Sequence, residues 1–241
     1  MIQVDSLGHL LGLAHHTLVY AGCGLSTSAG VAQTARGHSF VEPRSAAQLM
    51  SDRSRILRSE KRTEAVPGLA HFALTSLYKV WLETGLAWQS HNYALCQEGL
   101  IDGVVCLNHD GLLQKAGCPQ EAVHEVHGSW FDPANPALKA GGQPRQDIWQ
   151  RCLALLDKAD LCVVIGTSLS GLETDLIAET ASRRCGLGLV IVNLQQTRLD
   201  GEAVIKISSE ADTVMERLAI KLRLRFSVPK VGCQPRFGFS R

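Results

Sequence analysis

The sequence predicts an α/β protein built on a Rossmann-like, doubly wound parallel sheet with a reduced small lobe formed by insertions. Two observations support this fold class. The apolar runs are continuous rather than alternating, which is typical of strands buried on both faces. Stretches with helical periodicity separate these runs, and such alternation places helices on both faces of a parallel sheet. The chain has 241 residues, of which 45% are hydrophobic and 20% charged. It is therefore long enough for one large soluble domain.

Each expected element corresponds to one of these stretches. The apolar runs predict strands at 17–20, 103–106, 161–166, 187–193 and 203–208. The periodic stretches predict helices at roughly 67–84, 146–158, 172–184 and 211–224. Residues 37–66 and 129–147 interrupt the alternation, and we expect them to form the small lobe or lids. The expected organisation is one domain over residues 1–225 and a C-terminal tail over 226–241.

Charge and cysteine content exclude several classes of function. The formal net charge of +1 gives no global field that would favour nucleic acid or a membrane surface. No apolar stretch reaches the roughly 18 residues that span a bilayer, and no secretion signal is visible. The cysteines are scattered, without the paired spacing of a zinc ribbon. They fit a reducing compartment, so we expect an intracellular location, cytoplasmic or nuclear.

A glycine-rich turn follows the first predicted strand, in "LVYAGCGLSTSAG" (18–30). Gly22 and Gly24 permit a tight turn and close backbone approach to a ligand, and a following helix would direct its N-terminal amides at a phosphate. The dinucleotide fingerprint requires a third glycine three residues later, where this chain has Thr27 and only then Gly30. An ordinary strand-to-helix turn therefore stays open as the alternative.

Small polar residues also follow the other predicted strands. They are found in "GTSLSG" (166–171), at Asn193 and in "LNHDG" (107–111). Because the carboxyl ends of parallel strands share one edge of a sheet, these residues are expected to meet there. A nucleotide-binding crevice explains this arrangement most simply.

Six blocks occur in chain order: "GCGLSTSAGVAQTARG" (22–37), "VPGLAHFAL" (66–74), "VVCLNHDGLLQKAG" (104–117), "VHEVHGS" (123–129), "VVIGTSL" (163–169) and "IVNLQQT" (191–197). Together they resemble the sirtuins, the NAD-consuming protein deacylases and ADP-ribosyltransferases. In the first block, Gly22, Gly24, Ser26 and Gly30 match the family pattern, and Arg36 matches it after one inserted residue. The joint match is far more specific than any single block.

The resemblance implies NAD as a co-substrate and assigns roles to particular residues. His127 would be the general base on the nicotinamide ribose, while Asn108 and Asp110 would recognise the nicotinamide end. The other implied NAD contacts are Gly22, Cys23, Gly24, Ser26, Arg36, Gly166, Thr167, Ser168 and Asn193. The residue types suit the chemistry, because histidine titrates near pH 6.5 and an amide and a carboxylate can pair with a carboxamide.

The departures from the family concern the protein-substrate half. Cys106-Leu107 replaces Thr-Gln, and His109 replaces Ile. The zinc ribbon that follows the His-Gly-Ser motif in the family is replaced by residues without cysteine, and no Phe-Gly-Glu docking segment is found. We therefore expect no zinc. His124 and His127 are spaced as a metal-ligand pair could be, but no third ligand is apparent.

The remaining histidines, including His15, His16 and His71, are expected on the surface or in helix packing.

The predicted function is NAD-dependent deacylation of protein lysine with cleavage of the nicotinamide–ribose bond, so the expected partners are NAD and an acylated protein. One alternative is NAD hydrolysis or ADP-ribosyl transfer without an acyl-lysine substrate. The other is a module that binds NAD or ADP-ribose without turnover.

Overall fold

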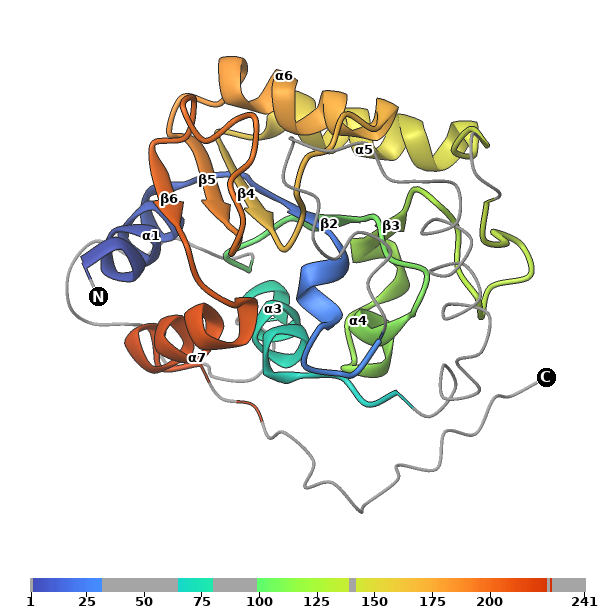
Figure 1. Cartoon of the computed structure of the whole chain (residues 1–241), viewed down its shortest axis with the longest axis horizontal. Helices are drawn as coiled ribbons and strands as arrows, with labels where there is room; N and C mark the ends of the chain where they lie inside the picture. Colours follow the sequence, from blue (N-terminus) through green and yellow to red (C-terminus); the bar gives the residue numbers. More distant parts are fainter. Residues whose placement is uncertain (1, 32–64, 80–98, 139–141, 225, 227–241) are drawn as a thin grey trace, which may run out of the picture.

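The computed structural model describes residues 2–31, 65–79, 99–138, 142–224 and 226. Within these residues, parallel strands form a six-stranded sheet in the order β3-β2-β1-β4-β5-β6 (Figure 1). The strands are β1 Thr17–Ala21, β2 Gly103–Cys106, β3 Val123–Glu125, β4 Leu161–Ile165, β5 Gly188–Val192 and β6 Ile205–Ile207. The strand order reverses between β1 and β4. In open α/β sheets such a switch point leaves a crevice at the carboxyl ends of the strands.

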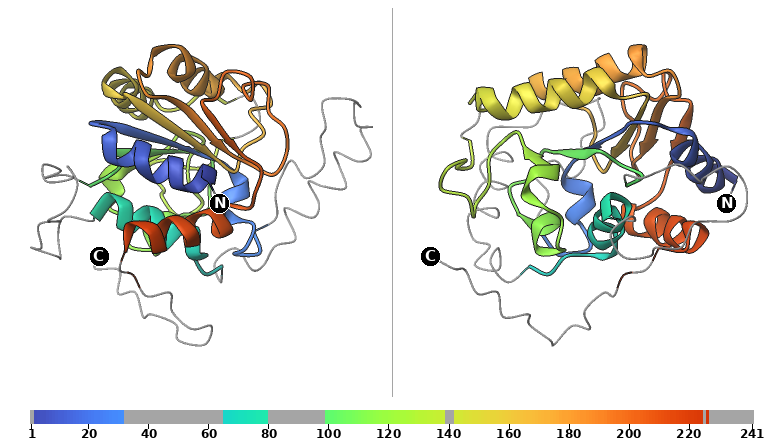
Figure 2. Two further views of the ribbon diagram at one scale, coloured as in Figure 1. Left: turned by 90° about the vertical axis from the view of Figure 1, so that its left-hand side faces the viewer. Right: turned by 180° about the vertical axis from the view of Figure 1, so that it is seen from behind.

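Helices cover both faces of the sheet, which confirms the predicted doubly wound α/β class (Figure 2). One face packs against α1 Ile2–Leu13, α3 Leu69–Lys79 and α7 Ala211–Leu222. The other face packs against α5 Gln146–Lys158 and α6 Leu176–Arg184. Shorter helical segments are η1 Cys23–Ser26, α4 Leu112–Lys115, η2 Gln120–Ala122 and η3 Glu173–Asp175.

Burial on both faces explains why the strands read as continuous apolar runs. In β1, Val19 and Ala21 belong to the core on the α1–α3–α7 side. Leu18 and Tyr20 alternate with them and belong to the core on the α5–α6 side. Full burial of a large apolar side chain contributes roughly 1.5–3 kcal/mol, so the predicted strands are held from both sides.

The five predicted strands and four predicted helices are all present, with ends that differ by a few residues. The part of the first predicted helix beyond Lys79 lies outside the described residues. Strand β3, helix α1 and the short segments η1, α4 and η2 were not predicted. Strand β3 has only three residues, two of them polar, so it shows no apolar run. Helix α1 contains Gly8, which brings it so close to α7 that an added Cβ would lie 2.9 Å from the Lys221 side chain.

The second predicted insertion folds back on the end of β3. Leu138 N–H donates to His127 O at 2.8 Å, and the Asn135 side chain donates to Glu125 O at 3.0 Å. The first insertion (37–66) and the tail (226–241) lie largely outside the described residues. The small lobe and the domain limits therefore stay predictions. No described helix is long and apolar enough to cross a membrane.

Candidate active site at the strand ends

The glycine turn after β1 packs directly on the turn after β4. Gly22 N–H donates to Ile165 O at 2.9 Å, and Gly24 N–H donates to Gly166 O at 2.7 Å. A Cβ on Gly24 would lie 2.6 Å from Gly166 Cα, and one on Gly166 would lie 2.4 Å from Leu25 N. Gly166 also has a φ of +65°, which favours glycine. Contact between the two turns is therefore a sufficient reason for glycine at these positions, and their contact with NAD stays a prediction.

The segment after the glycine turn also differs from the prediction. The turn leads into η1 (Cys23–Ser26), a single 3₁₀ turn beside α3 and α4 (Figure 1), and residues 27–30 form a further turn. No α-helix begins between Gly22 and Val31, so the helix N-terminus expected for a phosphate is not at this place. Within η1, burial raises the pKa of the Cys23 thiol. The predicted contact residue Arg36 lies outside the described residues.

The Ser26 hydroxyl is the centre of a buried polar cluster and is only 1% exposed. It donates to Asp110 Oδ2 at 2.6 Å and accepts from Asn108 Nδ2 at 3.1 Å. His71 Nε2 lies 3.3 Å from the same oxygen. Because Gly68 N–H donates to His71 Nδ1, the neutral ring carries its proton on Nε2 and donates to Ser26. One hydroxyl thus joins residues that follow β1 and β2 to helix α3.

The cluster holds two of the predicted catalytic residues in place. Asn108 Nδ2 also donates to Gly22 O at 3.1 Å, and Asp110 Oδ1 accepts Leu112 N–H at 3.1 Å. The prediction that Ser26, Asn108 and Asp110 lie together is consistent with this geometry.

The sequence predicted that His71 lies on the surface or packs within a helix, and the structure shows the second. It did not predict that His71 also joins the polar cluster. Its ring is 1% exposed, and burial lowers its pKa against the opposing effect of Asp110 and Asp212. The available signal was its place in the family-like block 66–74.

Ser26→Ala is expected to lower the free energy of unfolding by roughly 1–3 kcal/mol, because it leaves buried groups of the cluster without a partner. Ser170→Ala, at an exposed site beyond β4, is the matched control and should change stability by less than about 0.5 kcal/mol. Urea unfolding of both variants measures the difference. Equal stability of the two variants would contradict the role given to the Ser26 hydroxyl.

His127 lies just after β3 with its ring half buried. Its Nδ1 is 3.3 Å from Leu107 O, and its Nε2 is 3.3 Å from Thr174 Oγ1. A carbonyl can only accept, so the neutral ring carries its proton on Nδ1 and keeps a lone pair on Nε2. The next residue must be glycine, because Gly128 has a φ of +78° and an added Cβ would lie 2.2 Å from Pro136 O.

A second imidazole lies close to His127. The ring of His109 is 6.2 Å from that of His127 and 5.8 Å from that of Trp130, measured between centroids. His109 Nδ1 is 2.8 Å from Gly128 O, which fixes the ring to the loop that carries His127. Burial, and secondarily His109, lowers the pKa of His127. His127 is therefore neutral near pH 7 and able to accept a proton.

The residues predicted for the other end of NAD follow β4 and β5. Thr167 is buried, and its Oγ1 accepts Leu169 N–H at 3.2 Å. Ser168 is half buried beside it. Asn193 follows β5, and its side chain donates to Gln195 O at 3.1 Å. These residues add polar groups at the carboxyl ends of β4 and β5, which lie across the switch point from β2 and β3.

The described residues include no group of three or more His, Cys, Asp or Glu that could hold a metal ion. Six of the eight cysteines are described, and none of these six is in a disulfide. We predict that purified protein carries less than one zinc per chain and keeps its melting temperature in chelator, because the sequence has no paired cysteines. Elemental analysis tests this, and one zinc per chain would contradict it.

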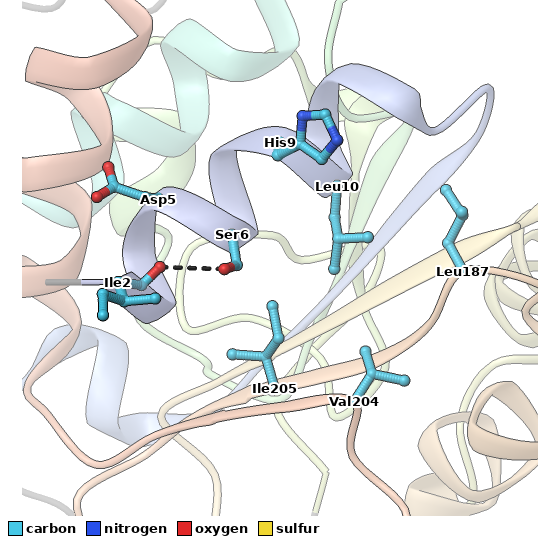
Figure 3. Close-up of a pocket in the computed structure, with 8 residues that line it drawn as sticks. All are labelled: Ile2, Asp5, Ser6, His9, Leu10, Leu187, Val204 and Ile205. Carbon is cyan, nitrogen blue, oxygen red and sulfur yellow. Dashed lines mark hydrogen bonds between the residues drawn. The ribbon is translucent and has the colours of Figure 1, made fainter.

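A groove of about 530 Å³ lies elsewhere, between α1 and the sheet edge (Figure 3). It is lined by Ile2, Asp5, Ser6, His9, Leu10, Leu187, Val204 and Ile205. Leu187 and Val204 directly precede β5 and β6, so the groove is at the amino ends of the strands. The polar cluster is at the carboxyl ends, and its identification rests on its buried hydrogen bonds rather than on this groove.

Comparison with known proteins gives sequence relatives, although no family model matches. The chain is 26% identical over 268 residues to "NAD-dependent protein deacetylase sirtuin-7" of Bos taurus, covering 92% of this chain and 60% of that protein. It is 24% identical to the "NAD-dependent protein deacetylase" of Saccharolobus solfataricus, covering 86% of this chain and 92% of that protein. The chain thus spans about three-fifths of the length of the sirtuin-7 proteins it matches.

Solved structures share the fold. The structure described as "Sir2-p53 peptide-NAD+" has a TM-score of 0.68 and 23% identity, covering 91% of this chain and 98% of that one. "Structure of Sir2Tm bound to a propionylated peptide" also has a TM-score of 0.68, with 22% identity over 92% of this chain and 100% of that one. The chain is thus similar in sequence, over about nine-tenths of its length, to proteins named as sirtuins, and it shares the fold of these solved structures.

Proposed function

We propose that this protein uses NAD as a co-substrate, cleaves its nicotinamide–ribose bond and transfers an acyl group from a protein lysine to the ADP-ribose product. One observation carries the proposal. A neutral histidine, His127, lies at the same sheet edge as the fixed pair Asn108 and Asp110, beside the switch point of the sheet. The relatives named as NAD-dependent deacetylases support the choice of reaction.

The donor set at this edge fits a nicotinamide nucleotide. Asn108 and Asp110 are 8% and 4% exposed and are held by buried partners, so an amide and a carboxylate are in place for a carboxamide. Thr167, Ser168 and Asn193 offer hydroxyl and amide groups on the other side of the switch point. NAD supplies the bond that breaks and the ribose hydroxyls. His127 would accept a hydroxyl proton at Nε2, the nitrogen that keeps a lone pair in the neutral ring.

NAD hydrolysis or ADP-ribosyl transfer without acyl-lysine is the second candidate. Leu107, next to Asn108, presents an apolar side chain where the family has glutamine, and the sequence lacks the Phe-Gly-Glu docking segment. The third candidate is binding of NAD or ADP-ribose without turnover.

Because the cysteines described are thiols outside disulfides, we also propose the intracellular location expected from the sequence.

Nicotinamide release from NAD, measured with and without an acetyl-lysine peptide, tests these proposals. Release that depends on the peptide, with matching loss of the acetyl group, supports deacylation. Release that is equal without peptide supports hydrolysis. NAD binding by calorimetry without release under either condition supports the binding module and contradicts the proposed reaction.

The acid limb of nicotinamide release should lie below pH 6.5, because a base must be neutral and burial lowers the pKa of His127. His109→Ala should move this limb to higher pH, since removing a neighbouring imidazole that can be charged raises the pKa of His127. His9→Ala is the control, because His9 is exposed on α1 at the opposite edge of the sheet. Rate profiles from pH 5 to 8 measure the shift. A limb unmoved in His109→Ala would contradict the coupling of the two rings.

A further inference from the structure

The turn after β4 (166–171) has a backbone conformation that its sequence does not favour. Gly166 and Gly171 have φ values of +65° and +92°, which suit glycine, but Leu169 between them has a φ of +49°. A left-handed conformation is unfavourable for leucine. Leu169 nevertheless adopts it while fully buried on the α5–α6 side of the sheet. Contacts from other parts of the chain must therefore hold the turn in this shape.

Arg198, in the loop after β5 (193–200), makes such a contact. Its Nε donates to Leu169 O at 2.8 Å. The same guanidinium pairs through Nη2 with Glu179 of α6, and Nη2 is 3.8 Å from Asp175 Oδ2. Because a guanidinium is planar and presents its donors in fixed directions, these acceptors set its position as well as its charge.

Asp175 holds the far end of the same turn. It is 0% exposed, and its Oδ2 accepts the backbone N–H groups of Gly171 and Leu172, each at 2.9 Å. Its Oδ1 accepts the hydroxyl of Tyr20, which lies in β1, at 2.8 Å. Arg198 therefore acts on the turn in two ways, directly at a carbonyl and beside a carboxylate that is fixed to the sheet.

The loop that carries Arg198 is itself held in place. Gln195 O accepts hydrogen bonds from Asn193 Nδ2 at 3.1 Å and from Lys206 Nζ at 3.0 Å. Lys206 Nζ also pairs with Asp200 Oδ1 at 3.1 Å. Arg198 thus joins the turn after β4 to a loop with a defined conformation.

The two joined segments carry residues predicted to contact NAD. Thr167 uses its Oγ1 to accept Leu169 N–H at 3.2 Å, so this hydroxyl already has a partner within the turn. Ser168 lies between them, is half buried and makes no hydrogen bond with another described residue. The shape of the turn therefore decides where the Ser168 hydroxyl is offered relative to Asn193 of the neighbouring loop.

We propose that Arg198 is a positioning residue for NAD, which holds the turn after β4 in its left-handed shape and fixes it to the loop after β5 before NAD binds. The inference rests on the proposed function, because it assumes that NAD binds at these strand ends. The contacts of Arg198 lie across the switch point from His127. Arg198 should therefore affect the binding of NAD and not the chemical step, since a site formed in advance binds more tightly.

The test compares Arg198→Met with Arg184→Met. The control removes the same charge and also breaks an ion pair, because Arg184 Nη1 is 2.9 Å from Asp157 Oδ1. Calorimetry should show that the affinities for NAD and for ADP-ribose both fall about tenfold in Arg198→Met, as expected if the turn keeps its binding shape about a tenth of the time. In the nicotinamide assay, KM for NAD should rise by the same factor while kcat stays within about twofold. The control should match the original chain in all these measurements.

Arg198→Lys separates charge from geometry. Lysine keeps the positive charge, but one ammonium group cannot bind the carbonyl and the carboxylates in the directions of the guanidinium. Its affinity for ADP-ribose should therefore stay near that of Arg198→Met. Full affinity in the lysine variant would show that charge alone is sufficient, and would overturn the positioning role.

Amide hydrogen exchange without ligand gives an independent measurement. The amides of Leu169, Gly171 and Leu172 should exchange faster in Arg198→Met than in the control, because these hydrogen bonds hold the turn. Faster exchange with unchanged affinity would mean that Arg198 only stabilises the turn, and would overturn the inference, as would unchanged exchange. If the original chain binds ADP-ribose but releases no nicotinamide, the proposed reaction is contradicted. A loss of affinity confined to Arg198→Met in that chain would still support this inference.

Discussion

His127→Ala is expected to lower the rate of nicotinamide release by roughly 10²–10⁴-fold while leaving the affinity for NAD largely unchanged. A general base interacts with the substrate mainly in the transition state, so its loss lowers kcat more than it weakens binding. We assign the base to this ring because its Nδ1 faces the Leu107 carbonyl, so that the neutral ring keeps its lone pair on Nε2. Steady-state release and calorimetry with NAD measure the two quantities separately.

His124→Ala is the matched control for this prediction. His124 lies three residues earlier, within β3, and burial and the nearby Arg151 of α5 lower its pKa. Its replacement should affect stability more than activity per folded molecule. If His124→Ala loses turnover while His127→Ala keeps it, the base has been assigned to the wrong histidine. If neither variant loses activity, the polar cluster is not the catalytic site.

The fold was largely predictable because the strands are buried on both faces. Runs such as "LCVVIG" are typical of strands in a sheet covered on both faces, and the ends of these strands were predicted to within a few residues. Strand β3 was not predicted, because polar side chains occupy two of its three positions. It is held by parallel pairing with β2, in which Val105 lies beside His124, and such pairing is not visible in a local pattern.

Topology alone predicted the candidate site only where residues follow recognised strand ends, whereas His127, which follows the unpredicted β3, was assigned through the family resemblance. Asn108, Asp110 and Ser26 come directly after predicted strands or their turns, so topology alone brings them together. Tyr20 and Asp175 are 155 residues apart in sequence, and each has a simpler local interpretation. In a strand "TLVY", a tyrosine reads as a core aromatic residue, and an acidic residue at the start of a predicted helix reads as part of its first turn. Their hydrogen bond depends on the spacing of β1 and β4 in the sheet, which no single segment reveals.

The glycines are a second case in which the local sequence did not reveal a tertiary contact. The sequence indicated that Gly22, Gly24 and Gly166 matter, and the resemblance implied contact with NAD. The structure places protein backbone or the Thr167 side chain where their Cβ atoms would be. Replacement is therefore expected to act first on folding, and any loss of NAD binding would follow from that.

Gly166→Val is accordingly expected to lower the free energy of unfolding by about 3–5 kcal/mol, since it combines a left-handed backbone with a collision against Gly24 and Leu25. Two control variants separate these causes. Gly171→Val has a φ of +92° but no atom within 4 Å of the added Cβ, so strain alone should cost roughly 1–2 kcal/mol. Gly201→Val has neither feature and should stay within about 0.5 kcal/mol of the original chain.

Urea unfolding of the three variants measures this order, and NAD calorimetry on those that fold measures binding. The expected ranking of stability is Gly201→Val above Gly171→Val above Gly166→Val. One outcome would instead support the interpretation that Gly166 is glycine because its surface contacts NAD. If Gly166→Val is as stable as Gly201→Val yet has lost NAD binding, the Cβ must meet the nucleotide rather than the protein. The two glycine turns would then be a ligand surface and not the backbone contact that joins β1 to β4.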